Sequence, residues 1–229
     1  MTFAYPGDEG AAPDDSARAA APAPDDSARA AAPAVLRGCD LAIPQGAFCL
    51  LAGDTGSGKT TLLRLAKPEI APAGSLSGSV RALGRDVRAL TPLESAQTVG
   101  YVFQSPDNQI VCDTVWHEMA FGLENLAVPE TEMRRRVAEV CYFFGMERWF
   151  HAKTSDLSGG QRQVLALAAT LAMRPRVLLL DEPTSMLDPL AEKGFASLLF
   201  RVNRELGVTV VVATHAPAPL VPFASMALR

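Results

Sequence analysis

The sequence predicts an α/β protein with a mostly parallel sheet flanked by helices, and three observations support this fold class. Apolar, strand-like runs at residues 48–52, 99–103, 177–180 and 208–213 alternate with segments whose apolar residues recur at helical spacing. The run 177–180 is apolar throughout, as is typical of a central parallel strand covered on both faces. Polar residues suited to chemistry follow the ends of these runs, at the edge where open parallel sheets bind ligands.

The length, hydrophobic content and net charge of the chain limit its number of domains and its possible partners. The chain has 229 residues, 48% of them hydrophobic, which suffices for one large α/β domain or two small ones. The net charge of −4 and the pI near 5.4 come without a dense Lys/Arg block, so we expect no nucleic-acid partner. No apolar run approaches the roughly 18 residues of a membrane span, and the N-terminal residues lack the basic, then apolar, pattern expected of a secretory signal. Any membrane role is therefore expected to go through a partner.

The four cysteines show no metal-ligand spacing. They are read as reduced, partly buried thiols of a cytosolic protein: Cys39, Cys49, Cys112 and Cys141.

The N-terminal region combines a short strand with a duplication. Phe3 and Tyr5 alternate with smaller residues, which predicts a strand that ends at Pro6. Residues 12–22 (APDDSARAAAP) then recur letter for letter as residues 23–33. This composition cannot bury much apolar area, so we expect a solvated surface loop over about 10–33 that arose by tandem duplication. A linker or docking segment is the alternative.

A glycine-rich stretch links the first apolar run to a helix. It reads GDTGSGKT and fits the phosphate-binding pattern G-x-x-x-x-G-K-[ST] between a strand and a helix. Its glycines let backbone N–H groups turn toward phosphates, Lys59 adds a positive charge, and the Thr60 hydroxyl can ligate Mg²⁺. A plain strand–helix turn is the alternative. The predicted nucleotide contacts are Gly53, Asp54, Thr55, Gly56, Ser57, Gly58, Lys59, Thr60 and Thr61.

The remaining elements follow from local signals. Pro68 is expected to stop the helix at 62–67, and Thr91-Pro92-Leu93-Glu94 predicts a helix start with a capping box. Further strands are predicted at 34–36, 40–43, 79–83, 99–103, 177–180 and 208–213, and further helices at 113–126, 131–144, 161–173 and 190–206.

Two acids follow the apolar run 177–180. Alone, such a pair also fits an ordinary turn at the end of a strand. Downstream of a phosphate-binding loop, however, Asp181 is placed to hold Mg²⁺ opposite Thr60, and Glu182 to act as general base toward the attacking water. The sequence therefore predicts ATP hydrolysis with ATP and Mg²⁺ as cofactors.

Residues 157–163 (LSGGQRQ) resemble the signature of the ATP-binding cassette (ABC) ATPases and stand in that family's order before Asp181. Gln104 resembles the family's Q-loop glutamine, residues 185–188 its D-loop, and His215 its switch histidine. Tyr5 resembles the aromatic residue that stacks on adenine. The resemblance covers nearly the whole chain outside the duplicated insert.

This resemblance implies a single ABC ATPase domain over 1–229. It has an antiparallel N-terminal β subdomain, a helical signature subdomain over about 104–160, and the insert in a hairpin loop. Glu182 and His215 are the implied catalytic residues, and Thr60, Gln104 and Asp181 the implied metal ligands. Two cassettes pair head to tail in this family, so the signature would contact the partner's ATP. The further implied nucleotide contacts are Tyr5, Gln104, Leu157, Ser158, Gly159, Gly160, Gln161 and Asp188.

Within the family, residues 104–109 (QSPDNQ) and 121–126 (FGLENL) are most similar to ATPases of energy-coupling factor importers. The resemblance implies uptake of a vitamin or a transition-metal ion. It also implies a transmembrane permease, a substrate-binding membrane component and a second ABC ATPase subunit, with this chain at the cytoplasmic face of the membrane. Trp116, Met119 and Phe121 either line the permease-docking groove or form ordinary core.

Some features depart from the family pattern. Residues 65–68 (LAKP) replace the usual Asn-Gly turn, and 216–219 (APAP) replace a commonly acidic position. The chain ends at Arg229 inside the expected final strand, without the family's C-terminal extension, so a weaker dimer is expected. Two other functions stay open: a soluble ABC ATPase of the DNA-repair or chromosome type, which would need a long coiled coil, and a truncated regulatory subunit that only binds ATP.

Overall fold

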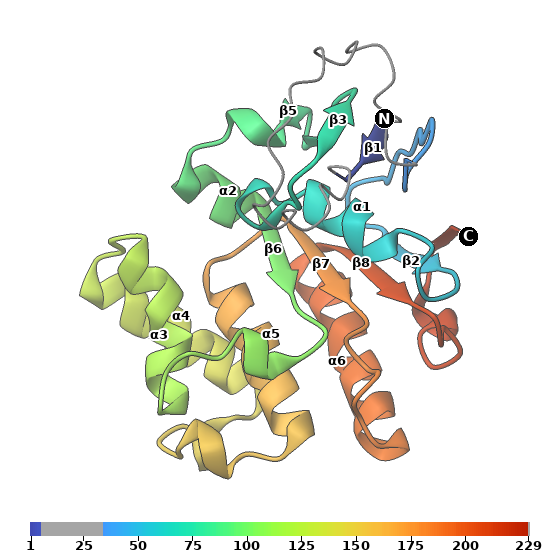
Figure 1. The fold of residues 1–229 in the computed structure, drawn as a ribbon. Helices are drawn as coiled ribbons and strands as arrows, with labels where there is room; N and C mark the ends of the chain where they lie inside the picture. Colours follow the sequence, from blue (N-terminus) through green and yellow to red (C-terminus); the bar gives the residue numbers. More distant parts are fainter. Residues whose placement is uncertain (6–33, 229) are drawn as a thin grey trace, which may run out of the picture.

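The computed structural model describes residues 1–5 and 34–228, and its centre is a five-stranded parallel sheet (Figure 1). The strand order is β6 (Val99–Val102), β7 (Val177–Asp181), β8 (Thr209–Thr214), β2 (Phe48–Ala52) and β9 (Met226–Leu228). Every neighbouring pair runs parallel. Strand β7 is buried from Leu178 to Asp181, as the apolar run 177–180 predicts. The predicted α/β class is therefore confirmed.

Helices cover both faces of this sheet, as Figure 1 shows. On one face, α1 (Lys59–Leu65) packs Leu63 against side chains of β2, β6 and β7. On the other, α5 (Gly159–Ala172) and α6 (Pro189–Leu206) contribute Leu165 and Leu199 to the main core. Helix α1 ends at Leu65, two residues earlier than predicted, because Lys67 already leaves helical geometry before Pro68.

A smaller antiparallel part lies above α1. Strand β1 (Thr2–Ala4) pairs with β3 (Ser75–Ser77), and β4 (Arg81–Ala82) pairs with β5 (Arg85–Asp86). The predicted strand at 34–36 is reduced to a single bridge between Leu36 and Phe3. The predicted strand at 40–43 is wrong: its side chains alternate in exposure, but no described strand pairs with it. The duplicated segment 12–33 lies outside the described residues.

The predicted helices between β5 and α5 are confirmed with small shifts at their ends. They are α2 (Pro92–Thr98), α3 (Val115–Asn125) and α4 (Glu130–Phe144). Thr91 and Glu94 form the predicted capping box, and Gly145 ends α4 with a φ of 65°. Both α3 and α4 pack against α5. None of the described helices is both long and apolar enough to cross a membrane.

The four cysteines are unpaired thiols, as predicted. Cys49 and Cys141 are buried, and Cys39 and Cys112 are partly buried. Burial raises the pKa of the Cys49 thiol to about 11, so this side chain behaves as a small apolar residue of the sheet.

Candidate nucleotide-binding and catalytic site

The glycine-rich stretch forms the loop between β2 and α1. Gly56 and Gly58 have φ values of 85° and 89°, a backbone conformation that residues with a Cβ atom rarely adopt. A Cβ at Gly58 would also lie 3.0 Å from the Leu36 side chain and 3.2 Å from Val35. The loop therefore needs glycine at this position for two separate reasons, and its backbone leads directly into the N-terminus of α1.

Lys59 is held at the inner wall of this loop. Its ammonium group donates to the carbonyl oxygens of Gly53 at 2.7 Å and Asp54 at 2.9 Å. It also lies 3.8 Å from the Glu182 carboxylate, and the two side chains are only 8% and 12% exposed. Because water screens such a pair poorly, the cation and the carboxylate attract each other strongly.

Thr60 and Asp181 meet next to this ion pair. The Thr60 hydroxyl donates to one Asp181 carboxylate oxygen at 2.9 Å, and Asp181 is 4% exposed. Hydroxyl and carboxylate oxygens are suitable ligands for Mg²⁺ when phosphate and water oxygens complete its coordination shell. The described residues contain no cluster of three His, Cys, Asp or Glu side chains that could hold a metal alone. The pair thus fits a Mg²⁺ ion that arrives with a nucleotide.

Glu182 sits at a strained position at the end of β7. Its φ is 46°, and its backbone N–H donates to the Ala213 carbonyl of β8 at 2.9 Å. Its carboxylate lies 2.8 Å from His215 Nδ1. Since a carboxylate only accepts, Nδ1 is the donor in this contact, and Nε2 lies outside it. The two predicted catalytic residues are thus in contact.

Gln104 follows β6 and lies in the direction of the predicted D-loop. Its amide donates to Ser185 Oγ at 3.4 Å. Among the described contacts it reaches neither Thr60 nor Asp181, so its predicted role as a metal ligand stays a prediction.

Gln109 connects the Q-loop to the signature helix. Its carbonyl oxygen accepts from Phe103 N–H at 3.0 Å. Its amide nitrogen donates to the Ala166 carbonyl at 3.2 Å and to Thr170 Oγ1 at 3.0 Å, both on α5. One side chain therefore joins the residue before Gln104 to the middle of α5.

The signature begins α5 with a capping box. Ser158 accepts from Gln161 N–H at 3.2 Å, and the Gln161 side chain accepts from Ser158 N–H at 2.9 Å. Ser158 and Gly159 are exposed, whereas the Leu157 side chain is 6% exposed and belongs to the core. Leu157 therefore presents little surface to a ligand. No hydrogen bond or ion pair joins the signature to the glycine-rich loop within the described part of the chain.

Tyr5 and Asp188, two further predicted contacts, differ in setting. The Tyr5 hydroxyl lies 2.9 Å from Thr61 Oγ1, and its ring is 42% exposed beside α1. Asp188 caps α6 by accepting from the N–H groups of Leu190 and Ala191, both at 3.0 Å. Tyr5 thus presents a ring near the loop, while Asp188 already has a structural role.

The three residues weighed between a docking groove and the core differ in burial. Met119 is fully buried in the main core, so the core alternative holds for it. Trp116 and Phe121 are 43% and 39% exposed. The indole of Trp116 stacks on His117 and lines a cavity of about 730 Å³ between α3 and α4. The helical repeat explains the split, because Met119 faces α5 whereas Trp116 and Phe121 face outward.

Sequence reasoning missed Tyr101 on β6. Its hydroxyl donates to the second Asp181 carboxylate oxygen at 3.1 Å, and the side chain is 7% exposed. Burial, and next the Asp181 carboxylate, raise the pKa of this phenol, so it keeps its proton. The available signal was a tyrosine within an otherwise apolar strand, three residues before Gln104.

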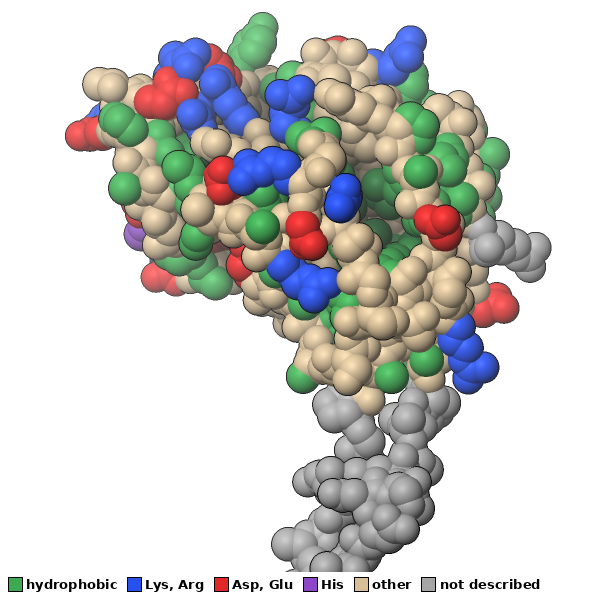
Figure 2. Space-filling view, turned by 90° about the horizontal axis from the view of Figure 1, so that it is seen from above, with side chains coloured by type: hydrophobic (Ala, Val, Ile, Leu, Met, Phe, Trp, Pro, Cys, Tyr) green, Lys and Arg blue, Asp and Glu red, His purple; other side chains and the backbone are tan. Residues whose placement is uncertain are grey.

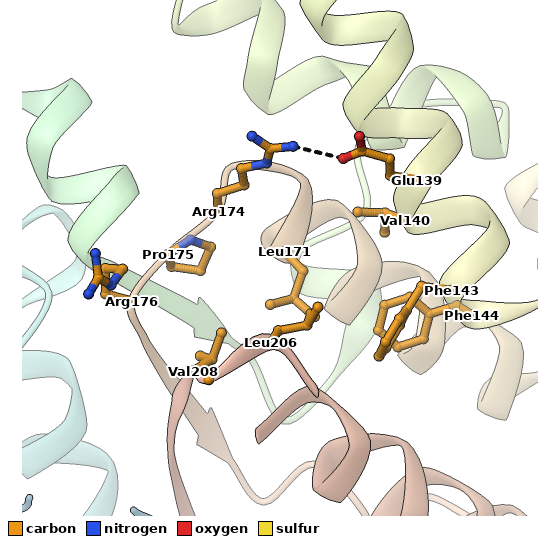
Figure 3. A pocket seen from close by; sticks show the side chains of 11 residues that line it. Glu139, Val140, Phe143, Phe144, Leu171, Arg174, Pro175, Arg176, Leu206 and Val208 are labelled. Atoms are coloured by element: carbon orange, nitrogen blue, oxygen red, sulfur yellow. Dashed lines mark hydrogen bonds and ion pairs between the residues drawn. The ribbon is translucent and has the colours of Figure 1, made fainter. Parts of the chain in front are cut away.

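Another cavity, of about 450 Å³, lies away from this site (Figure 3). It is lined mainly by apolar side chains near the C-terminal ends of α4, α5 and α6, including Phe143, Leu171 and Leu206. Arg174 and Glu139 form an ion pair of 2.7 Å at its rim. None of the sequence-predicted site residues lines it.

The surface carries charges of both signs. In the view of Figure 2, Lys/Arg and Asp/Glu side chains are interspersed, and hydrophobic side chains show in a hollow between them. This face has no continuous basic surface of the kind that binds a phosphate backbone.

The comparisons with known proteins agree with this geometry. The family profile described as ABC transporter matches residues 36–185. This chain belongs to the ABC transporter family. Its fold is accordingly that of an ABC-type P-loop NTPase, and the expected family is confirmed. The match spans the glycine-rich loop, the signature and the two acids at the end of β7.

Curated relatives extend over longer chains. A protein of Bacillus thuringiensis subsp. konkukian, provisionally named an ABC transporter ATP-binding protein, is 46% identical over 83% of this chain and 34% of its own length. The energy-coupling factor transporter ATP-binding protein EcfA1 of Symbiobacterium thermophilum is 45% identical over 79% of this chain and 62% of its own length. The chain thus spans about a third of the first curated relatives it matches.

Two solved structures share the fold. One is cbiO1 of Clostridium perfringens, described as part of the ABC transporter complex cbiONQ, with a TM-score of 0.76 and 32% identity over 84% of this chain and 76% of that chain. The other is the ATP-binding cassette MJ0796 in a dimeric post-hydrolysis state bound to ADP and Pi, with a TM-score of 0.71 and 29% identity over 86% and 87%.

Proposed function

We propose that this ABC family chain is the ATP-binding and ATP-hydrolysing subunit of an importer. It would drive uptake of a vitamin or a transition-metal ion through a separate membrane permease. One observation carries the hydrolytic part: Lys59, Glu182 and His215 form a contiguous set beside the Thr60–Asp181 pair. These groups supply a phosphate-binding cation, a base and a metal site at one edge of the sheet.

Binding of ATP uses groups whose positions are already fixed. The loop amides and the N-terminus of α1 favour anionic phosphate, and the Lys59 ammonium lies at the same loop. The positive charge of a bound Mg²⁺ would offset part of the negative charge of the phosphates. Thr60 and Asp181 would hold that ion, and the exposed ring of Tyr5 would stack on the base.

Hydrolysis would use the acid next to the metal site. The Glu182 carboxylate is positioned to orient a water and accept its proton, because it is partly buried beside the metal site and held by His215. His215 Nε2 remains free of the Glu182 contact and would face the terminal phosphate. The exposed signature would act in trans, so the working unit is a dimer of two cassettes, identical or different.

The importer assignment rests on relatives and on a surface. EcfA1 and cbiO1 carry names that refer to an energy-coupling factor transporter and a cbiONQ complex. The cavity between α3 and α4, lined by Trp116, Ala120, Met133 and Val137, offers apolar area to a short amphipathic helix of the permease. This docking would keep the chain at the cytoplasmic face of the membrane. The compact α3–α4 region contains no coiled coil of the kind a chromosome-type ATPase needs, within the described residues.

Two substitutions test the two parts of the proposal. Lys59→Ala removes the loop cation and is expected to abolish ATP binding and turnover, whereas unchanged ATPase activity would refute the site. Trp116→Ala is expected to leave ATP binding intact but to lower co-purification with the permease components. Phe121→Ala, on another side of α3, is the matched control. If both variants assemble as the wild type does, the docking surface is wrong.

A further inference from the structure

The metal-binding carboxylate has a second partner that the proposed mechanism does not use. Asp181 offers two oxygens: one accepts from Thr60 at 2.9 Å and the other from the Tyr101 hydroxyl at 3.1 Å. Asp181 and Tyr101 are 4% and 7% exposed, so water does not compete freely for either bond. The carboxylate is therefore held from two sides by two different elements, α1 and β6.

The Tyr101 side chain cannot easily turn away. Its ring makes an edge-on contact with Phe103 at 5.0 Å between centroids and packs in the cluster with Leu63 and Leu179. Strands β6 and β7 are neighbours with Tyr101 beside Leu179, two residues before Asp181. Because a carboxylate only accepts, the Tyr101 hydroxyl is the hydrogen-bond donor in this contact.

We infer that Tyr101 is a positioning residue for the Mg²⁺ site. It occupies one oxygen of Asp181 and so directs the other toward Thr60 and the ion. This inference rests on the proposed ATPase function. Groups that hydrogen-bond to metal ligands fix ligand orientation, and their loss commonly weakens metal binding by roughly 10–100-fold. Tyr101 itself would touch neither the nucleotide nor the metal.

The test is nucleotide binding by the full 229-residue chain as a function of Mg²⁺. Tyr101→Phe removes only the hydroxyl and keeps the ring contact with Phe103. A fluorescent ATP analogue gives the dissociation constant in EDTA and across a Mg²⁺ titration. We expect the EDTA value to stay within about twofold, because the loop and Lys59 are unchanged, and the Mg²⁺ midpoint to rise roughly tenfold. Tyr142→Phe, at an 80% exposed tyrosine of α4, is expected to match the wild type.

Three outcomes separate this inference from simpler ones. Saturating Mg²⁺ is expected to restore the ATPase rate of Tyr101→Phe to within about twofold, whereas a merely structural defect lowers the rate at every Mg²⁺ concentration. A melting curve of the same sample reports folding independently. A Mg²⁺ titration that superimposes on the wild type overturns the role of Tyr101 alone. Absence of any Mg²⁺ dependence in the wild type instead overturns the proposed metal site, and this inference with it.

Discussion

Substitution of Glu182 by Gln should separate binding from hydrolysis. The carboxylate lies 3.8 Å from the Lys59 ammonium, and both side chains are nearly buried. At an effective dielectric constant of about 20, this pair attracts by about 4 kcal/mol. The ATP phosphates must compete with Glu182 for the Lys59 ammonium, and their negative charge is repelled by the Glu182 carboxylate. Glutamine keeps the shape but removes the charge, so ATP is expected to bind more tightly.

Only part of this attraction energy contributes to the change in ATP affinity, because Lys59 keeps its hydrogen bonds to Gly53 and Asp54 in both the wild type and Glu182→Gln. We expect roughly tenfold tighter binding, which corresponds to about 1.4 kcal/mol. Turnover is expected to fall by about 10² to 10⁴, the usual contribution of a general base. ATP-bound dimers should therefore accumulate.

The assay combines a fluorescent ATP analogue, phosphate release and size-exclusion chromatography. Glu205→Gln, which removes an exposed carboxylate of α6 paired with Arg201, is the matched control. Wild-type turnover in Glu182→Gln would refute its role as base. Weaker ATP binding would refute the competition between this carboxylate and phosphate for Lys59.

Three further predictions concern stability and assembly. Asn203→Ala, which removes the donor to the carbonyls of Gly46 at 2.9 Å and Val208 at 2.8 Å, is expected to cost about 2 kcal/mol in urea unfolding; an unchanged midpoint would contradict this. Ser158→Ala should cost about 1 kcal/mol as a lost cap. Ser158→Asp should keep the cap but prevent ATP-driven dimers in light scattering, because its charge opposes phosphate, and wild-type dimerisation would count against the signature's role. The hydrogen bond from Arg85 lowers the pKa of Glu94 from 4.5 to about 2. Glu94 thus stabilises the fold above pH 4.5 and loses this effect toward pH 2, so melting temperatures of wild type and Glu94→Gln should converge in acid.

Elements with local signals were predicted closely from the sequence. The strand 48–52 matches β2 residue for residue, and the capping box at Thr91 and the terminal Gly145 place the ends of α2 and α4. In these cases the determining interactions span only a few residues, so the pattern contains them. The helix predicted from residue 113 begins at Val115 instead, because Thr114 pairs with the distant Lys153.

The sequence was a poor guide where the local structure depends on residues that are distant in the chain. Residues 40–43 alternate as a strand should, yet a strand needs a neighbour, and the pattern says nothing about whether one exists. For Met119 the sequence left groove and core open, with core the commoner case for such a helix, and its packing in the main core decides for core. For the site, the residue types were readable from motifs. The sequence also put Asp181 opposite Thr60, and these two side chains are in contact. It did not predict the contacts Lys59–Glu182 and Tyr101–Asp181, because they depend on the strand order β6, β7, β8, β2.

The side chain of Gln109 has a mechanical consequence. Its amide oxygen accepts from Phe103 N–H, and its amide nitrogen donates to Ala166 and Thr170 in the middle of α5. A rotation of the signature helix relative to the sheet would pull directly on the backbone that carries Gln104. A displacement of that backbone would in turn be felt at the start of α5, where Ser158 stands. The segment that carries Gln104 and the signature helix α5 are thus coupled through the single uncharged amide of Gln109. Because this amide carries no charge, salt does not screen its hydrogen bonds.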